Sequence, residues 1–194
     1  EKSESEIKRI AKASFRNMGI TLVEISSFEW FSDDDFRKFV KYDNIEIINK
    51  LREQKRGIIL MSGHFGNWEA VAYTAGLFTG VAITIVVKRQ KNADVDQKIN
   101  KFRTRSGNKI VQMSQAAKPL IKALLSNEAV ALLADQAAKK EKDIYVDYFS
   151  RPALTYESPA ELALRFKTPI IMGFTVRNAE GTYNVHLEEV KHDD

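Results

Sequence analysis

The chain has 194 residues, of which 44% are hydrophobic and 29% are charged, as is typical of one globular domain. It contains no cysteine, which excludes a disulfide framework, a thiolate metal site and a cysteine nucleophile. No segment has the roughly 18–20 uninterrupted apolar residues that span a bilayer, and the net charge of +4 favours anionic partners.

The first third of the chain is expected to be helical. Residues 4–25 place apolar side chains three and four positions apart, which is the spacing of an amphipathic helix. Ser32 is a candidate helix N-cap, because Asp33–Asp35 would then lie in the first turn and complement the helix dipole. A third helix is expected over Asn44–Gln54, ending before Gly57.

From residue 57 onward, apolar runs rich in β-branched residues alternate with helical patterns. Strands are expected at Ile58–Met61, Val81–Val87, Lys109–Gln112, Val130–Ala134 and Ile170–Val176. Helices are expected between them at Trp68–Phe78, Asp94–Arg105, Gln115–Leu125 and Glu157–Phe166. This alternation predicts an α/β fold, with a mostly parallel sheet covered by helices on both faces.

The end of the chain predicts one further strand. Thr182–Val190 alternates apolar and polar residues and is expected to be an antiparallel edge strand. Lys139, Lys140 and Lys142 are expected in a surface loop. Because no linker is evident, residues 1–194 are predicted to form a single domain, with a helical lead-in over 1–56 and an α/β core over 57–194.

The stretch GIILMSGHFGNWE, which ends at Glu69, contains one of the three histidines of the chain. His64 directly follows the expected strand Ile58–Met61 and its glycine turn, at the position where open α/β sheets collect reactive groups. Gly66 permits a bend, so that His64 and Glu69 can converge. A carboxylate that accepts a hydrogen bond from one imidazole nitrogen leaves the other nitrogen to remove a proton.

Other interpretations of His64 fit the pattern less well. A lone histidine is more often structural, but the flanking glycines, the strand end and the nearby acid favour catalysis. Ser62 does not lie in a Gly-x-Ser-x-Gly motif, so the expected base acts on a hydroxyl or amine of the substrate. His186 and His192 lie far along the chain without ligand spacing, and GHFGN lacks the Walker lysine and the dinucleotide glycines, so no metal or cofactor is expected.

The segment HFGNWE matches the His-x4-Asp/Glu motif of membrane-surface acyltransferases. Its surroundings resemble the lipid A biosynthesis (lauroyl/myristoyl) acyltransferase family, within the bacterial lysophospholipid-acyltransferase-like superfamily. The resemblance covers nearly the whole chain, in the order ASFRNMGITLVEI, the HFGNWE motif, VVKRQKN, FRTRSG, LLADQ and VDYFSRPALTYESPAELALRFKTPIIMGF. It implies a glycerol-3-phosphate-acyltransferase-like fold. Family members usually have an N-terminal hydrophobic anchor and a C-terminal tail, so the chain is expected to be a fragment that lacks both.

The resemblance also implies an activity. It is the transfer of a fatty acyl group from acyl carrier protein or acyl-CoA to a hydroxyl of a membrane glycolipid such as a lipid A precursor. The resemblance implies that no cofactor takes part and that the reaction occurs at the cytoplasmic face of the bacterial inner membrane. By this match His64 would be the general base and Glu69 its orienting acid. The substrate-binding positions implied by the family motifs are Arg89, Asn92, Arg103, Gly107, Asp135 and Gln136, although Gln90 stands where the family has proline.

Basic residues crowd the middle of the chain, at Lys88, Arg89, Lys91, Lys98, Lys101, Arg103, Arg105 and Lys109. Such a cluster suits phosphate groups, an acidic carrier protein or an anionic membrane surface. Nucleic acid is not expected as a partner, because only Phe102 is interleaved with the basic residues. A catalytically silent lipid- or carrier-binding module of the same fold is the alternative, and the intact His64–Glu69 motif weighs against it.

Overall fold

The structure is a computed structural model that describes residues 2–136, 138 and 143–191. The expected surface loop with Lys139, Lys140 and Lys142 lies outside these residues, as does His192.

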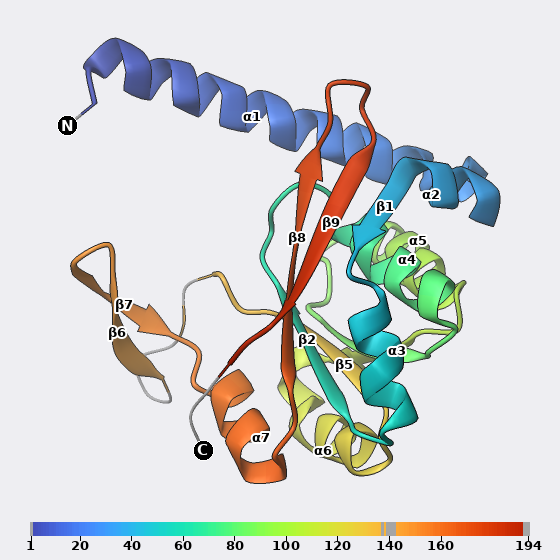
Figure 1. The fold of residues 1–194 in the computed structure, drawn as a ribbon. Coiled ribbons are helices and arrows are strands. Elements are labelled where there is room, and N and C mark those ends of the chain that lie inside the picture. The colour runs from blue at the N-terminus through green and yellow to red at the C-terminus, as the bar shows by residue number, and fades with distance from the viewer. Residues whose placement is uncertain (1, 137, 139–142, 192–194) are drawn as a thin grey trace.

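A seven-stranded sheet forms the centre of the molecule (Figure 1). Its strand order is β1 (Val40–Asp43), β9 (Tyr183–Glu189), β8 (Ile170–Arg177), β2 (Ile58–Ser62), β5 (Ala129–Leu133), β3 (Ile83–Val87) and β4 (Lys109–Gln112). The five strands from β8 to β4 are parallel, whereas β9 runs antiparallel to β8 and parallel to β1. The α/β class with a mostly parallel sheet, predicted from the alternating pattern, is confirmed.

Helices pack on both faces of this sheet. The helices are α1 (Glu4–Ser27), α2 (Asp33–Phe39), α3 (Glu46–Glu53), α4 (Trp68–Thr79), α5 (Ala93–Thr104), α6 (Ala117–Leu125) and α7 (Ser158–Phe166), with short 3-10 helices at Phe28–Trp30 and Met113–Gln115. Consecutive residues of β2 enter different cores: Ile58 packs in the cluster with Tyr73 of α4, and Ile59 in the cluster with Leu120 of α6. This alternation is the physical reason that a continuous apolar run forms a strand buried on both faces.

The first third of the chain is less helical than expected. β1 was not expected, because VKYD is a short run directly after a helix and its partner β9 lies about 140 residues later, with Val40 opposite Tyr183. Since β1 pairs with β9, β9 is antiparallel as expected but is not an edge strand. The cap at Ser32 is present as a capping box with Asp35.

A two-stranded hairpin, β6 (Ile144–Tyr148) and β7 (Arg151–Thr155), forms a second sheet that was not expected. Figure 1 shows it standing apart from the main sheet, and shows α1 lying across the upper end of β8 and β9 with its N-terminal part beyond the body. In the described part of the chain, no helix is both long and apolar enough to cross a membrane.

Candidate active site

β2 and β5 are neighbours in the sheet, and their register brings two side chains together at the carboxyl edge. Ser62, the last residue of β2, pairs with Leu133, the last residue of β5. His64 and Asp135 each come two residues later, so both leave the sheet at the same level. The imidazole Nδ1 of His64 lies 2.8 Å from Oδ1 of Asp135, and the backbone N–H of His64 donates to Oδ2 at 2.7 Å.

This contact keeps the carboxyl group of Asp135 ionised. Burial raises the pKa of Asp135, but the hydrogen bonds from the side chain and backbone of His64 and the Coulomb attraction outweigh it, so the pKa lies below its ordinary value. The carboxylate is therefore ionised at neutral pH and accepts the Nδ1–H hydrogen bond. When His64 is neutral with its proton on Nδ1, Nε2 is the nitrogen that can accept a proton, and no described residue hydrogen-bonds to it. With its side chain 32% exposed, His64 is accessible to a substrate.

Glu69 has a different partner from the one expected. It lies in the first turn of α4 and is 5% exposed, and both of its carboxylate oxygens accept hydrogen bonds from Arg103 of α5, from Nε at 2.8 Å and from Nη2 at 2.5 Å. Among the described residues no hydrogen bond or ion pair joins His64 to Glu69. The Arg103 guanidinium, which the resemblance assigns to substrate binding, is thus held by a carboxylate of the protein itself.

Residues 63–67 form a tight loop between β2 and α4. Gly66 has a φ of +60°, and a Cβ added to it would lie 2.1 Å from Oγ1 of Thr175, so the backbone approaches β8 too closely for any side chain. Asn67 is fully buried and caps α4, because its Oδ1 accepts a hydrogen bond from the backbone N–H of Ala70 at 3.1 Å. Both features hold the loop in one conformation.

Of the remaining residues implied by the resemblance, Arg89, Asn92 and Gln136 follow the carboxyl ends of β3 and β5, whereas Gly107 precedes β4 at the opposite edge of the sheet. Arg89 is exposed after β3, and Asn92 caps α5 by accepting a hydrogen bond from the N–H of Val95 at 3.1 Å. Gly107 follows α5 with a φ of +87° and open space at its Cβ position, so its conformation ends the helix. Gln136 is exposed after β5. None of the described hydrogen bonds joins these four residues to the histidine–carboxylate pair.

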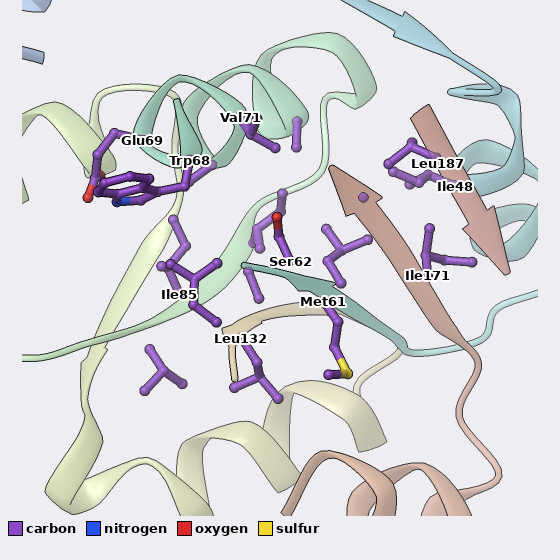
Figure 2. Close-up of a pocket in the computed structure, with 18 of the residues that line it drawn as sticks. Ile48, Met61, Ser62, Trp68, Glu69, Val71, Ile85, Leu132, Ile171 and Leu187 are labelled. Atoms are coloured by element: carbon purple, nitrogen blue, oxygen red, sulfur yellow. The ribbon is translucent and has the colours of Figure 1, made fainter. Parts of the chain in front are cut away.

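A cavity of about 90 Å³ lies between α4 and the sheet, beside the pair. Trp68, whose ring centroid is 5.0 Å from that of His64, lines it together with Ser62, Glu69 and Arg103. The rest of the lining is apolar and includes Val71, Ala72 and Ala75 of α4 and Leu60, Ile83, Ile85, Ala131, Ile171 and Leu187 of the sheet. Figure 2 shows Glu69 and Trp68 on one side of this lining and Ile48, Ile171 and Leu187 on the other.

The chemistry that this arrangement supports is removal of a proton by His64 next to an apolar space. In the part of the chain that the structure describes, no group of three or more His, Cys, Asp or Glu side chains is placed to hold a metal ion.

Sequence reasoning missed the residues that hold the loop from the other side. Thr175 of β8 and Thr21 of α1 hydrogen-bond to its backbone, and Glu24 of α1 bonds to Asn67. No local pattern marks these residues, because each lies at least 43 positions from its partner. For Asp135 there was a signal, namely LLADQ at the end of an expected strand.

Comparison with known proteins shows the family of the chain. The sequence profile of the family described as bacterial lipid A biosynthesis acyltransferase matches residues 1–189. A lipid A biosynthesis acyltransferase of Haemophilus influenzae is 28% identical over 151 residues. The alignment covers 77% of this chain and 46% of the relative, so the chain spans about half the length of that protein.

Proposed function

The chain belongs to the bacterial lipid A biosynthesis acyltransferase family, and from this premise we propose that it is an O-acyltransferase. The proposed donor is a fatty acyl thioester, on acyl carrier protein or coenzyme A, and the proposed acceptor is a hydroxyl of a membrane glycolipid such as a lipid A precursor. The observation that carries the proposal is the 2.8 Å contact between His64 and Asp135, at the carboxyl edge of the sheet and beside an apolar cavity.

In the proposed reaction His64 is the general base. Its Nε2 removes the proton of the acceptor hydroxyl while the hydroxyl oxygen forms a bond to the thioester carbonyl carbon. The tetrahedral intermediate then collapses, the carbon–sulfur bond breaks, and the thiolate leaves with the proton that His64 holds. Asp135 orients the imidazole and stabilises its positive charge between these two steps.

This assignment differs from the one that the motif suggests. The resemblance makes Glu69 the orienting acid, whereas the geometry favours Asp135, because Asp135 is the carboxylate that hydrogen-bonds to the imidazole. Glu69 contributes by holding Arg103, and the buried ion pair of these two residues fixes the wall of the cavity next to Trp68. A buried, bidentate ion pair is a rigid element on which a site can be built.

The polar parts of the substrates are proposed to meet the surface around Arg89. This residue and its neighbours Lys88 and Lys91 are exposed beyond the carboxyl end of β3. Their charge suits a lipid phosphate or an acidic carrier protein. Asn92, Gly107 and Gln136 remain candidate substrate contacts, and for Asn92 and Gly107 the observed cap and helix end explain the residue type independently.

The cavity is the proposed place for the acyl chain. At about 90 Å³ it is smaller than the roughly 150 Å³ apolar cavity that admits a benzene molecule, so a fatty acyl chain enters only as the lining side chains move apart. An almost entirely apolar lining next to a polar reaction centre suits a thioester whose tail is apolar and whose carbonyl reacts.

The acceptor lipid implies an anionic membrane surface, and we place the enzyme at the cytoplasmic face of the inner membrane. α1 supports this proposal, since apolar side chains such as Ile7, Phe15 and Met18 are exposed on it, alongside the exposed basic residues Lys8 and Arg9. Amphipathic helices with basic residues bind anionic lipid surfaces.

The proposal is tested by acyl transfer from radiolabelled acyl carrier protein to a bacterial lipid extract. Wild type and the control His186→Ala, which changes an exposed histidine of β9, are expected to produce a labelled lipid. His64→Ala is expected to lose at least about 100-fold in rate, which is the contribution of a general base. If none of the three proteins transfers label while all bind donor or lipid, the chain is a catalytically silent binding module instead.

A further inference from the structure

The loop that carries His64 is held by hydrogen bonds from two elements remote in sequence. Thr175 of β8 donates from Oγ1 to the carbonyl of Phe65 at 2.7 Å and accepts from the backbone N–H of Asn67 at 3.2 Å. Thr21 of α1 donates from Oγ1 to the carbonyl of Gly66 at 3.2 Å. Both threonines are 1% exposed, so their hydrogen bonds to the loop are buried and shielded from water.

The carboxylate of Glu24 also hydrogen-bonds to the loop, and at the same time to residues of β8 and β9. Glu24 of α1 accepts from Nδ2 of Asn67 at 3.0 Å, from the hydroxyl of Tyr183 at 2.8 Å and from Nη2 of Arg177 at 2.9 Å, and its second oxygen accepts from Nη1 of Arg177. The Glu24 and Arg177 side chains are 16% and 18% exposed. The guanidinium carbon of Arg177 lies 4.7 Å from the centroid of the Tyr183 ring, so these two partners of Glu24 also make a cation–π contact with each other.

The donors to Glu24 keep their protons over the whole neutral range. The hydrogen bond with Glu24 raises the pKa of Arg177, and burial, followed by the hydrogen bond to Glu24, raises the pKa of Tyr183 to about 12. Arg177 and Tyr183 therefore remain hydrogen-bond donors to the carboxylate at neutral pH.

The hydrogen bond from Asn67 to Glu24 connects this network to the loop that carries His64. Because Glu24 takes the Nδ2 side of the amide, the Oδ1 side faces the first turn of α4 and caps it. His64 lies three residues before Asn67, across Gly66, which has no side chain to restrict its backbone. Bonds at Phe65, Gly66 and Asn67 thus restrict the backbone that follows the base, in addition to the bond from the backbone N–H of His64 to Asp135.

We infer that Glu24, with its partner Arg177, is a positioning residue for His64: α1 holds the catalytic loop so that the imidazole meets Asp135. The inference rests on the proposed acyltransferase function. It makes α1 a part of the active-site support although none of its residues touches the imidazole.

The test is Glu24→Gln, which keeps the shape of the side chain and removes its charge. We expect kcat to fall by about 10- to 100-fold, because displacement of a catalytic group by about 1 Å costs up to that factor. KM for the acyl donor is expected to stay within about threefold, since Glu24 lies outside the cavity lining. Thr21→Val removes the bond to the carbonyl of Gly66 and a long bond of 3.5 Å from Nη2 of Arg177, and it keeps the Glu24–Arg177 pair. It is the milder variant to use if Glu24→Gln does not fold, and a smaller fall in kcat is expected.

The matched control is Asp33→Asn. Asp33 also accepts hydrogen bonds from a tyrosine and an arginine, Tyr73 and Arg105, but in a network that joins α2 to α4 and α5. This variant is expected to lower the melting temperature and to leave kcat unchanged. If Glu24→Gln and Thr21→Val lower the melting temperature in the same way with kcat intact, the network is purely structural and the inference is overturned.

A second readout does not need acyl transfer. The ¹⁵N spectrum of the histidine side chains reports the tautomer of His64, whose Nδ1 is the protonated nitrogen when it bonds to Asp135. A shifted or broadened His64 signal in Glu24→Gln supports positioning, and an unchanged signal overturns it. If the wild type transfers no acyl group from any donor, the proposed function fails, and this spectrum still decides whether α1 positions the loop.

Discussion

Asp135 holds His64 by two atoms at once, with one oxygen on the imidazole and the other on the backbone N–H. An asparagine in its place offers only one acceptor, so one of the two contacts must fail or the imidazole must change its tautomer. Asp135→Asn is therefore expected to lower kcat by at least about 100-fold. Steady-state kinetics with labelled donor measure this, and Asp147→Asn, the same exchange at an exposed residue of β6, is the comparison that should keep activity.

The same residue predicts a pH dependence of stability. Because the pKa of Asp135 in the folded protein lies below its ordinary value of about 3.9, the ionised carboxylate stabilises the folded state above about pH 4. This contribution is lost as the pH falls through the lowered pKa. Urea titrations should give the wild type a larger free energy of unfolding than Asp135→Asn at pH 7, and the two values should converge below pH 4. A difference in unfolding free energy that stays constant down to pH 2.5 would contradict the assignment.

Gly66 is the other residue whose identity the site requires. Gly66→Ala would place a methyl group 2.1 Å from Oγ1 and 2.6 Å from the carbonyl oxygen of Thr175, in addition to the strain of a positive φ. Gly80 has nearly the same φ, +64°, and a Cβ added there would have no atom within 4 Å, so Gly80→Ala measures the strain alone, about 1 kcal/mol. Unfolding by denaturant should show Gly66→Ala losing at least about 2 kcal/mol more than Gly80→Ala.

At the scale of elements, α4 and α5 are joined through Glu69 and Arg103. The two side chains are 7% and 13% exposed, so removing one partner leaves a buried charge and is expected to cost about 3–5 kcal/mol of unfolding free energy. The double variant Glu69→Gln with Arg103→Met should cost clearly less than the sum of the single variants. A double-mutant cycle measures the difference.

The surface pair Lys109–Glu128, with side chains 56% and 34% exposed, is the control for that cycle. Its coupling free energy should not exceed about 1 kcal/mol, because solvent screens exposed charges. Equal coupling in both pairs would show that the pair between α4 and α5 is solvated in solution and does not fix the cavity wall.

At the scale of the whole molecule, two apolar cores lie on opposite faces of the sheet, and the cavity belongs to one of them. Ala131→Leu fills part of this cavity and is expected to slow transfer of long acyl chains relative to short ones by about 10-fold or more. Ala123→Leu, on the buried side of α6, adds the same volume on the other face and should leave this ratio unchanged. Both variants cost about 1–3 kcal/mol by overpacking. Competition between two labelled donors measures the ratio, and an equal effect of both variants would place the acyl chain elsewhere.

Local patterns determined most of the elements from the sequence alone. Continuous apolar runs such as Ile58–Met61 predicted buried strands, and the helical spacing between them predicted crossover helices, because both patterns depend on neighbours a few positions apart. His64 could likewise be placed at a strand end, since the apolar run Ile58–Met61 ends just before it at the turn residue Gly63. β1 escaped prediction because four residues after a helix carry no period of their own, and only β9 makes them a strand.

The partners across the site were decided by the tertiary structure. The sequence predicted Glu69 as the partner of the imidazole and Asp135 as a substrate-binding residue. In the structure Glu69 binds Arg103, and Asp135, 71 residues after His64, binds the imidazole. The pairing follows from β2 and β5 lying side by side in matched register, which depends on the order of strands in the sheet. The bond between Glu24 and Arg177, 153 positions apart, has the same origin. Spacing along a chain specifies which face a side chain occupies, whereas the contact that a side chain makes depends on which element packs against that face.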